Sequence, residues 1–175
     1  PSTDMRYPEA HKDATRHRIV KAAARRFRRD GPHGTAIGDI MTDLRLTHGG
    51  FYRHFRGKDD LLAEALAHAV RDASHRLERV ALAAPAGARA AAIIDAYLSP
   101  GHAADRPGGC PIAALGSDLD RESAALRGSA FEVAWREYLT RMSAYMPGAT
   151  AEARTRTIGF PSVELRGRKR SSRTA

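Results

Sequence analysis

Residues 37–58 read IGDIMTDLRLTHGGFYRHFRGK. Apolar side chains recur at three- and four-residue steps in the first part, which predicts a short helix over residues 37–44. A second short helix is predicted over residues 48–54, because Thr47 precedes it as a candidate cap. Two short helices joined by a tight turn have the size of a helix-turn-helix, whose second helix enters the major groove of DNA.

The second predicted helix combines an apolar back, formed by Phe51 and Phe55, with side chains suited to duplex DNA. Small or hydrogen-bonding residues at its start would let it approach base edges closely, and these are His48, Gly49 and Gly50. The side chains one turn later that could reach flanking phosphates are Tyr52, Arg53 and His54. Lys58 stands at the start of the next helix, where free backbone amides favour an anion.

The rest of the chain is also predicted to be helical. Alanine is abundant, aromatic residues make up only 6% of the sequence, and no segment alternates as a strand does, so the expected fold class is all-α. A helix over residues 15–29 should end at Asp30-Gly31-Pro32. The other helices are expected over residues 58–84, 88–98, 111–119 and 123–146, with a loop over residues 99–109.

Charge is concentrated at the N-terminal end of the chain. The formal net charge is +9, and residues 1–60 carry 13 Lys and Arg against 8 Asp and Glu, whereas residues 61–157 carry 11 of each. This distribution suggests a polyanionic partner, although surplus arginine that only keeps the chain soluble would fit as well. Lys12, Arg16 and Arg18 could contact DNA as an arm, but solvated surface is the favoured reading.

Composition excludes several classes of protein. The single cysteine, Cys110, excludes a disulfide framework or a cysteine-rich zinc module and is expected to be a small buried residue. No apolar run approaches the roughly 18 residues of a membrane span, and residues 1–12 contain no secretion signal, so we expect a cytoplasmic protein without membrane contact. Because no glycine-rich phosphate loop or nucleophile–base pair appears, we expect neither an enzyme nor a cofactor.

Three potential metal ligands recur at helical spacing in the middle of the chain. His68, Asp72 and His75 share one face of a predicted helix, with Arg71 and Arg76 beside them. An exposed polar stripe is the favoured interpretation, since no further ligand is indicated, and no metal is expected.

The chain resembles the TetR/AcrR family of transcriptional regulators. The matching residues are IVKAAARRF at 19–27, then Gly31, Thr35 and Asp39-Ile40, and THGGFYRHFRGKDDLL at 47–62. A weaker likeness to one branch of the family lies in GCPIAAL at 109–115. The resemblance implies a repressor that binds a palindromic operator in double-stranded DNA as a homodimer, joined through its C-terminal helices, and that a small-molecule effector releases.

The resemblance also implies roles for individual residues. Those expected to face bases are Thr47, His48, Gly49 and Gly50, and those expected to hold phosphates are Thr35, Tyr52, His54 and Lys58. Gly38 falls at a helix position that often touches DNA in relatives. Arg45 stands where the family usually has glycine, so a left-handed turn there would be strained by about 1 kcal/mol. The pair Gly49-Gly50 weakens its helix by roughly 1 kcal/mol per glycine, which predicts a helix that becomes firm only on DNA.

A pocket for an apolar or aromatic effector is expected in the C-terminal half. Its candidate lining is Ile94, Tyr97, Leu98, Trp135, Tyr138 and Met142, with His102 and Arg106 as polar contacts. Core packing or subunit contact explains the same aromatic stripe equally well.

Three segments are expected along the chain. Residues 11–60 would form the DNA-binding domain, residues 61–158 the effector-binding and dimerisation domain, and residues 159–175 a basic, disordered tail. The basic composition of this tail differs from the last apolar helix that the resemblance to the family implies. The alternative function is therefore a non-specific nucleic-acid-binding helical protein, or a regulator fragment that dimerises poorly.

Overall fold

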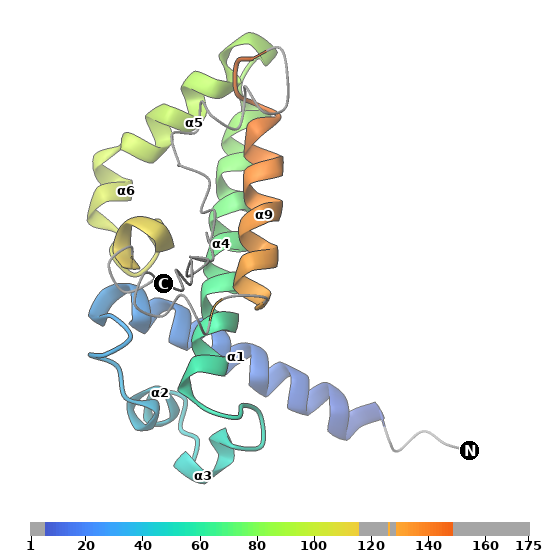
Figure 1. Ribbon diagram of the computed structural model, residues 1–175, viewed down its shortest axis with the longest axis vertical. Coiled ribbons are helices and arrows are strands. Elements are labelled where there is room, and N and C mark those ends of the chain that lie inside the picture. The colour runs from blue at the N-terminus through green and yellow to red at the C-terminus, as the bar shows by residue number, and fades with distance from the viewer. Residues whose placement is uncertain (1–5, 116–125, 127–128, 149–175) are drawn as a thin grey trace, which may run out of the picture.

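The structure is a computed structural model, and it describes residues 6–115, 126 and 129–148 (Figure 1). Every regular element in those ranges is a helix, which confirms the all-α prediction. The helices are α1 (Arg6–Asp30), α2 (Ile37–Asp43), α3 (His48–Phe51), α4 (Lys58–Ala83), the short 3-10 helix η1 (Ala86–Ala88), α5 (Arg89–Leu98), α6 (Pro100–Ala104) and α9 (Ala130–Ser143). Residues 111–115 are helical as well.

Helix α4 is the central helix of the molecule, against which α1, α5 and α9 pack. It runs from the end formed by α1, α2 and α3 to the opposite end, with α9 alongside it and α5 leaning away toward α6 (Figure 1). Its apolar face is buried along several turns, from Leu61 and Leu62 through Leu66 to Val70. The long helix expected over residues 58–84 is therefore confirmed.

One hydrophobic cluster unites the N-terminal helices with the start of α4. Phe27 of α1, Met41 of α2, Phe51 of α3 and Leu61 of α4 are all buried in it, and Leu115 from the later chain joins them. Because each of the short helices contributes only one or two large side chains, their position depends on this shared core.

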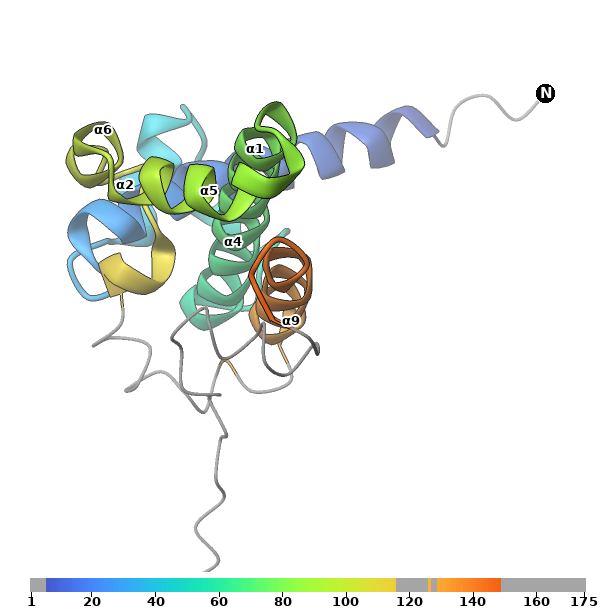
Figure 2. The same cartoon turned by 90° about the horizontal axis from the view of Figure 1, so that it is seen from above.

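Helix α1 begins at Arg6, well before the expected start at Thr15. The side chains of residues 9–14 are exposed, and the first turns project beyond the body of the molecule (Figure 2). The apolar stripe from which the helix was predicted starts only at Ile19. The expected stop is confirmed: Gly31 adopts φ 75°, and its N–H donates to the Phe27 carbonyl at 2.9 Å.

Two expectations for the later chain were wrong. The loop expected over residues 99–109 contains α6, because the Ser99 hydroxyl accepts from the His102 N–H at 3.2 Å and Pro100 occupies the first helical turn. The single helix expected over residues 123–146 is interrupted at Ser129, which is extended and caps α9 by accepting from the Phe131 N–H.

Some predicted segments lie outside the described residues. These are the end of the helix expected over residues 111–119, the start of the one over residues 123–146, and residues 149–175 with the predicted tail. Among the helices that the structure describes, none is long and apolar enough to cross a bilayer.

Candidate nucleic-acid interface

The turn between α2 and α3 is tight and left-handed at one residue. Arg45 adopts φ 57°, so the strain expected at this position is present. The turn is closed by two backbone hydrogen bonds, from the Arg45 N–H to the Thr42 carbonyl at 2.9 Å and from the Leu46 N–H to the Met41 carbonyl at 2.8 Å. This geometry sets the direction in which α3 leaves the core.

Helix α3 is a single turn and is shorter than predicted. It ends at Phe51, whereas the sequence predicted a helix to His54. Thr47 caps it as expected, because its hydroxyl accepts from the Gly50 N–H at 3.3 Å. The chain continues as turns, with the His54 N–H donating to the Phe51 carbonyl at 2.9 Å. Two glycines in four residues account for this minimal length.

Two phenylalanines hold the back of α3 in the core. Phe51 is fully buried and Phe55 is 2% exposed, and their rings stack with centroids 5.4 Å apart. Both were expected to face inward, which is confirmed. Because they anchor one face, the opposite face of α3 is turned outward.

The outward face brings together most of the residues expected to contact bases. Thr47, His48 and Gly49 are exposed, and the His48 ring meets the ring of Tyr52 edge-on at 5.9 Å. A Cβ on Gly38 of α2 would lie 3.8 Å from His48 Nδ1, so α2 also borders this surface. Among the described residues, no atom lies within 4 Å of the place a Cβ on Gly49 would take, so this end of α3 is open to a close approach.

The residues expected to reach phosphates differ in how far their side chains are exposed. Tyr52 is 60% exposed, and the side chain of Arg53 is exposed beside it. Lys58 is half-buried as the first residue of α4. His54 is also half-buried, and its Nδ1 has no hydrogen-bond partner among the described residues.

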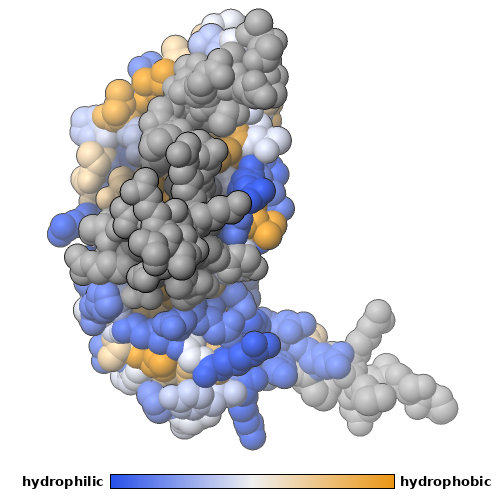
Figure 3. Space-filling view, viewed as in Figure 1, coloured by the Kyte–Doolittle hydropathy of each residue, from blue (hydrophilic) through white to orange (hydrophobic). Residues whose placement is uncertain are grey.

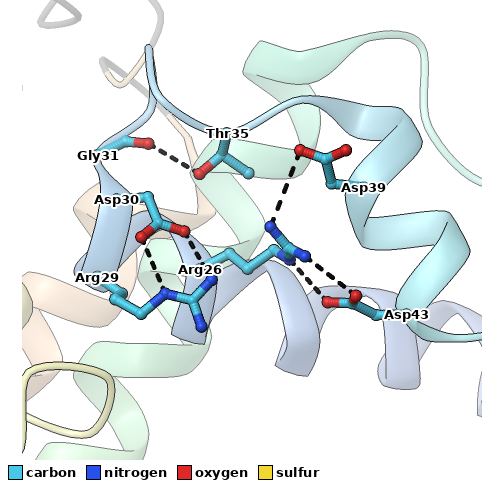
Figure 4. Close-up of polar contacts among 7 residues, drawn as sticks. All are labelled: Arg26, Arg29, Asp30, Gly31, Thr35, Asp39 and Asp43. Atoms are coloured by element: carbon cyan, nitrogen blue, oxygen red, sulfur yellow. Dashed lines mark hydrogen bonds and ion pairs between the residues drawn. The ribbon is translucent and has the colours of Figure 1, made fainter.

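Thr35 is placed differently from the prediction. Its side chain is 1% exposed, and its hydroxyl donates to the Gly31 carbonyl at 2.9 Å (Figure 4). The N-cap of α2 is Ala36, which makes no side-chain capping bond. With its hydroxyl used inside the core, Thr35 stabilises the loop before α2 and does not offer that hydroxyl to a phosphate.

An ion pair that the sequence did not reveal fastens α2 to α1. Arg26 donates to both carboxylate oxygens of Asp43, at 2.7 and 3.0 Å, and lies 3.9 Å from Asp39 (Figure 4). The hydrogen bond from Arg26 holds the pKa of Asp43 below its ordinary value. The two ends of this pair lie 17 residues apart in the chain, so no local pattern could identify it.

Arg16 is a structural brace and not a free basic arm. Its guanidinium donates to the His54 carbonyl and to the carboxylate of Glu64, and it stacks over the Phe55 ring at 4.2 Å. It therefore joins α1, the turns after α3, and α4 at a single point. The arrangement supports the chain just beyond the helix-turn-helix.

Four of the eight residues expected to line an effector pocket line one cavity. These are Tyr97, His102, Trp135 and Tyr138. The sequence missed Val70, Arg76, Leu77 and Cys110, which line the same cavity from α4 and from the turn after α6. The cavity volume is about 30 Å³, room for roughly two water molecules. A larger ligand would require the helices to separate.

The four other candidates do not line this cavity. Ile94 and Leu98 are 49% and 71% exposed on the outside of α5, and Met142 is buried at 1% exposure within the packing of α9. The helix spacing that grouped them with Tyr97 and Tyr138 does not reveal which face of α5 or α9 turns toward α4. Arg106 is exposed.

Two tyrosines, Tyr97 and Tyr138, line the cavity beside the polar side chains of Arg76 and His102. Burial and a hydrogen bond shared with Cys110 raise the pKa of Tyr97 to about 12. Burial raises the pKa of Tyr138 to about 12 as well. Both hydroxyls therefore stay protonated at neutral pH, and the ring of His102 lies 5.0 Å from that of Tyr97.

The polar stripe on α4 holds no metal-type cluster. Asp72 forms an ion pair with Arg76, and the rings of His68 and His17 meet edge-on at 5.4 Å. In the part of the chain that the structure describes, no three His, Cys, Asp or Glu side chains converge as metal ligands would.

Comparison with known proteins identifies the N-terminal region. Residues 19–65 match the model of a family described as bacterial regulatory proteins, tetR family. The HTH-type transcriptional repressor Rv3405c of Mycobacterium tuberculosis is 35% identical over 68 residues, which are 39% of this chain and 36% of that protein. The uncharacterized HTH-type transcriptional regulator Rv0196 of the same organism is 34% identical over 122 residues, 63% of this chain and 58% of that protein.

The matched region runs from α1 through the turn at Arg45 to the first turns of α4. Over this region the helix-turn-helix geometry and the relatives agree on one class, the helix-turn-helix regulatory proteins. Residues 19–65 are the part of the chain that the tetR family of bacterial regulatory proteins shares. The chain spans less than two thirds of the length of these relatives, 36% of one and 58% of the other.

Proposed function

We propose that the chain is a sequence-specific DNA-binding transcriptional regulator that acts as a repressor. The observation that carries this proposal is the outward tip of α3, which Phe51 and Phe55 hold by their buried rings while His48 and Gly49 stay exposed. A helix held in this way can place its first residues against base edges in the major groove.

Roles follow from the position of each side chain relative to the tip. His48 is the side chain best placed to select a base pair, and Gly49 and Gly50 let the backbone come close. Thr47 and Gly38 border the same face. Tyr52, Arg53 and Lys58 flank it and would hold phosphates, which adds affinity without adding choice of sequence.

We propose a homodimer on a palindromic operator, with residues 11–60 as the DNA-binding domain and residues 61–158 as the effector-binding and dimerisation domain. A two-fold dimer would present its two α3 tips about 34 Å apart, one turn of DNA. The repressor role is supported by the printed name of Rv3405c, a relative over its matched 68 residues. Release would come from a small apolar or aromatic molecule that opens the cavity between α4, α5 and α9.

Selection of bound duplexes from a random DNA pool, followed by a footprint, tests the main proposal. We expect a palindromic site, and we expect His48→Ala to change preference at one base pair. Lys58→Ala should weaken binding to all sequences and flatten the salt dependence by about one unit. Equal affinity of the chain for every duplex, with a monomer in sedimentation, would instead support the non-specific or dimerisation-impaired alternative.

The effector proposal has its own readout. Trp135 is the only tryptophan of the chain and lines the cavity. A compound that enters this cavity and releases DNA should change the fluorescence of Trp135. The change should occur at the same concentration of compound that releases DNA. Release with no change in the Trp135 signal would argue against this cavity.

A further inference from the structure

Residues 9–14 of α1 extend this helix beyond its packed part, which begins at Ile19. The side chains of residues 9–14 are exposed, and the helix projects past the body of the molecule (Figure 2). These turns nevertheless border a hollow next to α3. The α1 residues that line it are His11, Lys12 and Thr15, and the facing ones are Met41, Leu46, Thr47, Gly50, Arg53 and His54.

The hollow is basic and contains no acidic side chain. Lys12 enters from α1 and Arg53 from the turn after α3, and none of the lining residues is Asp or Glu. Asp13 of the same helix lines a different hollow, between α1 and α4. The neighbouring Arg16 is already paired with Glu64. In Figure 3 the surface over α1 and the helix-turn-helix is mostly hydrophilic.

The pKa of His54 reflects the excess of positive charge around its ring. Its Nδ1 is buried and has no hydrogen-bond partner among the described residues. Burial lowers the pKa of His54, and the charges of Lys12, Arg16 and Arg53 lower it further. Such a cluster of cations facing an unpartnered ring nitrogen would be stabilised by an anion.

We propose that this hollow binds the DNA backbone, with Lys12 of α1 and Arg53 on its two sides holding a phosphodiester group beside the bases that α3 reads. The proposal rests on the proposed function and adds α1 to the DNA-binding surface. Thr47, the cap of α3, and Gly50 of α3 also line the hollow, so a DNA strand that meets the tip of α3 passes directly by it.

Salt dependence of DNA binding by the full chain tests the proposal. Lys12→Gln and Arg53→Gln should each reduce the slope of log affinity against log salt by about one unit, because each removes one phosphate contact. Lys21→Gln is the matched control, since Lys21 is exposed on the same helix and does not line the hollow. A slope for Lys12→Gln equal to that of Lys21→Gln would overturn the proposal.

The two proposals can fail separately. If the wild-type chain binds duplex DNA and only Lys12 has no effect, the DNA-binding function stands and the role of α1 falls. If the wild-type chain binds no duplex at any salt concentration, both fall. Circular dichroism melting of each variant verifies that the exposed substitutions leave the fold intact.

A histidine titration by NMR supplies a second readout. We expect DNA to raise the pKa of His54, so that affinity grows as the pH falls through the value in the complex, and Lys12→Gln to weaken this change. Inorganic phosphate, tested against chloride at equal ionic strength, distinguishes the source of the anion. A His54 response to phosphate as large as the response to DNA would indicate a free-anion site and overturn the backbone assignment.

Discussion

The guanidinium of Arg28 donates a hydrogen bond to the carbonyl of Gly109 at 3.2 Å, although the two residues are 81 positions apart. Arg28 is 7% exposed, and its Nε also donates to the Ala24 carbonyl at 2.9 Å. From α4, Arg76 donates to the adjacent Gly108 carbonyl at 2.6 Å. The turn before Cys110, a wall of the cavity, is thus tied directly to the last turns of α1.

The first prediction concerns this tie. Arg28→Met should lower the free energy of unfolding by about 2 kcal/mol, because the Gly109 carbonyl loses its charged hydrogen-bond donor at a buried site. Urea denaturation measures the loss. The control is Arg25→Met, which changes an exposed residue of the same helix and should have an effect within about 0.5 kcal/mol. Equal stability of the two variants would show that the buried contact contributes nothing.

The two glycines of α3 should respond differently to alanine. Gly49→Ala places its methyl in open space and should strengthen the helix by about 1 kcal/mol. At Gly50 a Cβ would stand 3.3 Å from the Thr47 hydroxyl oxygen that caps the helix, so Gly50→Ala should give no such gain. Thermal denaturation compares them. The idea would be contradicted by a Gly49→Ala variant that is less stable than Gly50→Ala.

The left-handed turn residue offers a stabilising substitution. Arg45 adopts φ 57°, and Arg45→Gly should raise stability by up to about 1 kcal/mol because glycine relieves the steric strain. Arg45→Asn should give a smaller gain, since asparagine tolerates this conformation better than arginine does. The measurement is the melting temperature of each variant. A melting temperature that falls for both would indicate that the arginine side chain outweighs the strain.

The ion pair between Arg26 and Asp43 predicts a specific dependence on pH. The hydrogen bond from Arg26 lowers the pKa of Asp43 from its ordinary value of 3.8. The stabilisation by this carboxylate is therefore complete above that ordinary value and is lost as the pH falls through the lower, folded-state pKa. NMR titration of the Asp43 carboxyl should show the low value in the wild type and an ordinary one in Arg26→Gln. An unchanged titration in the variant would assign the shift to another neighbour.

The helix-turn-helix could be predicted from the sequence because its signals are local. The cap at Thr47, the stop at Gly31 and the inward rings of Phe51 and Phe55 depend on residues within a few positions of one another. The left-handed conformation at Arg45 was expected only from the resemblance to the family, because the local sterics of an arginine disfavour it. The length of α3 was less predictable, because a single turn that contains two glycines is only marginally stable as a helix.

The amino-acid sequence alone determined that this protein is all-α and that a helix-turn-helix begins near residue 37. Both follow from helical spacing and turn chemistry, which are properties of neighbouring residues. Only the tertiary structure decided that Arg16 is a brace, that Thr35 faces the core, and that Tyr97 and Trp135 share a cavity with Cys110. These outcomes depend on which faces of α1, α4, α5 and α9 pack together. That choice is made by burial over the whole fold, and its partners lie tens of residues apart in the chain.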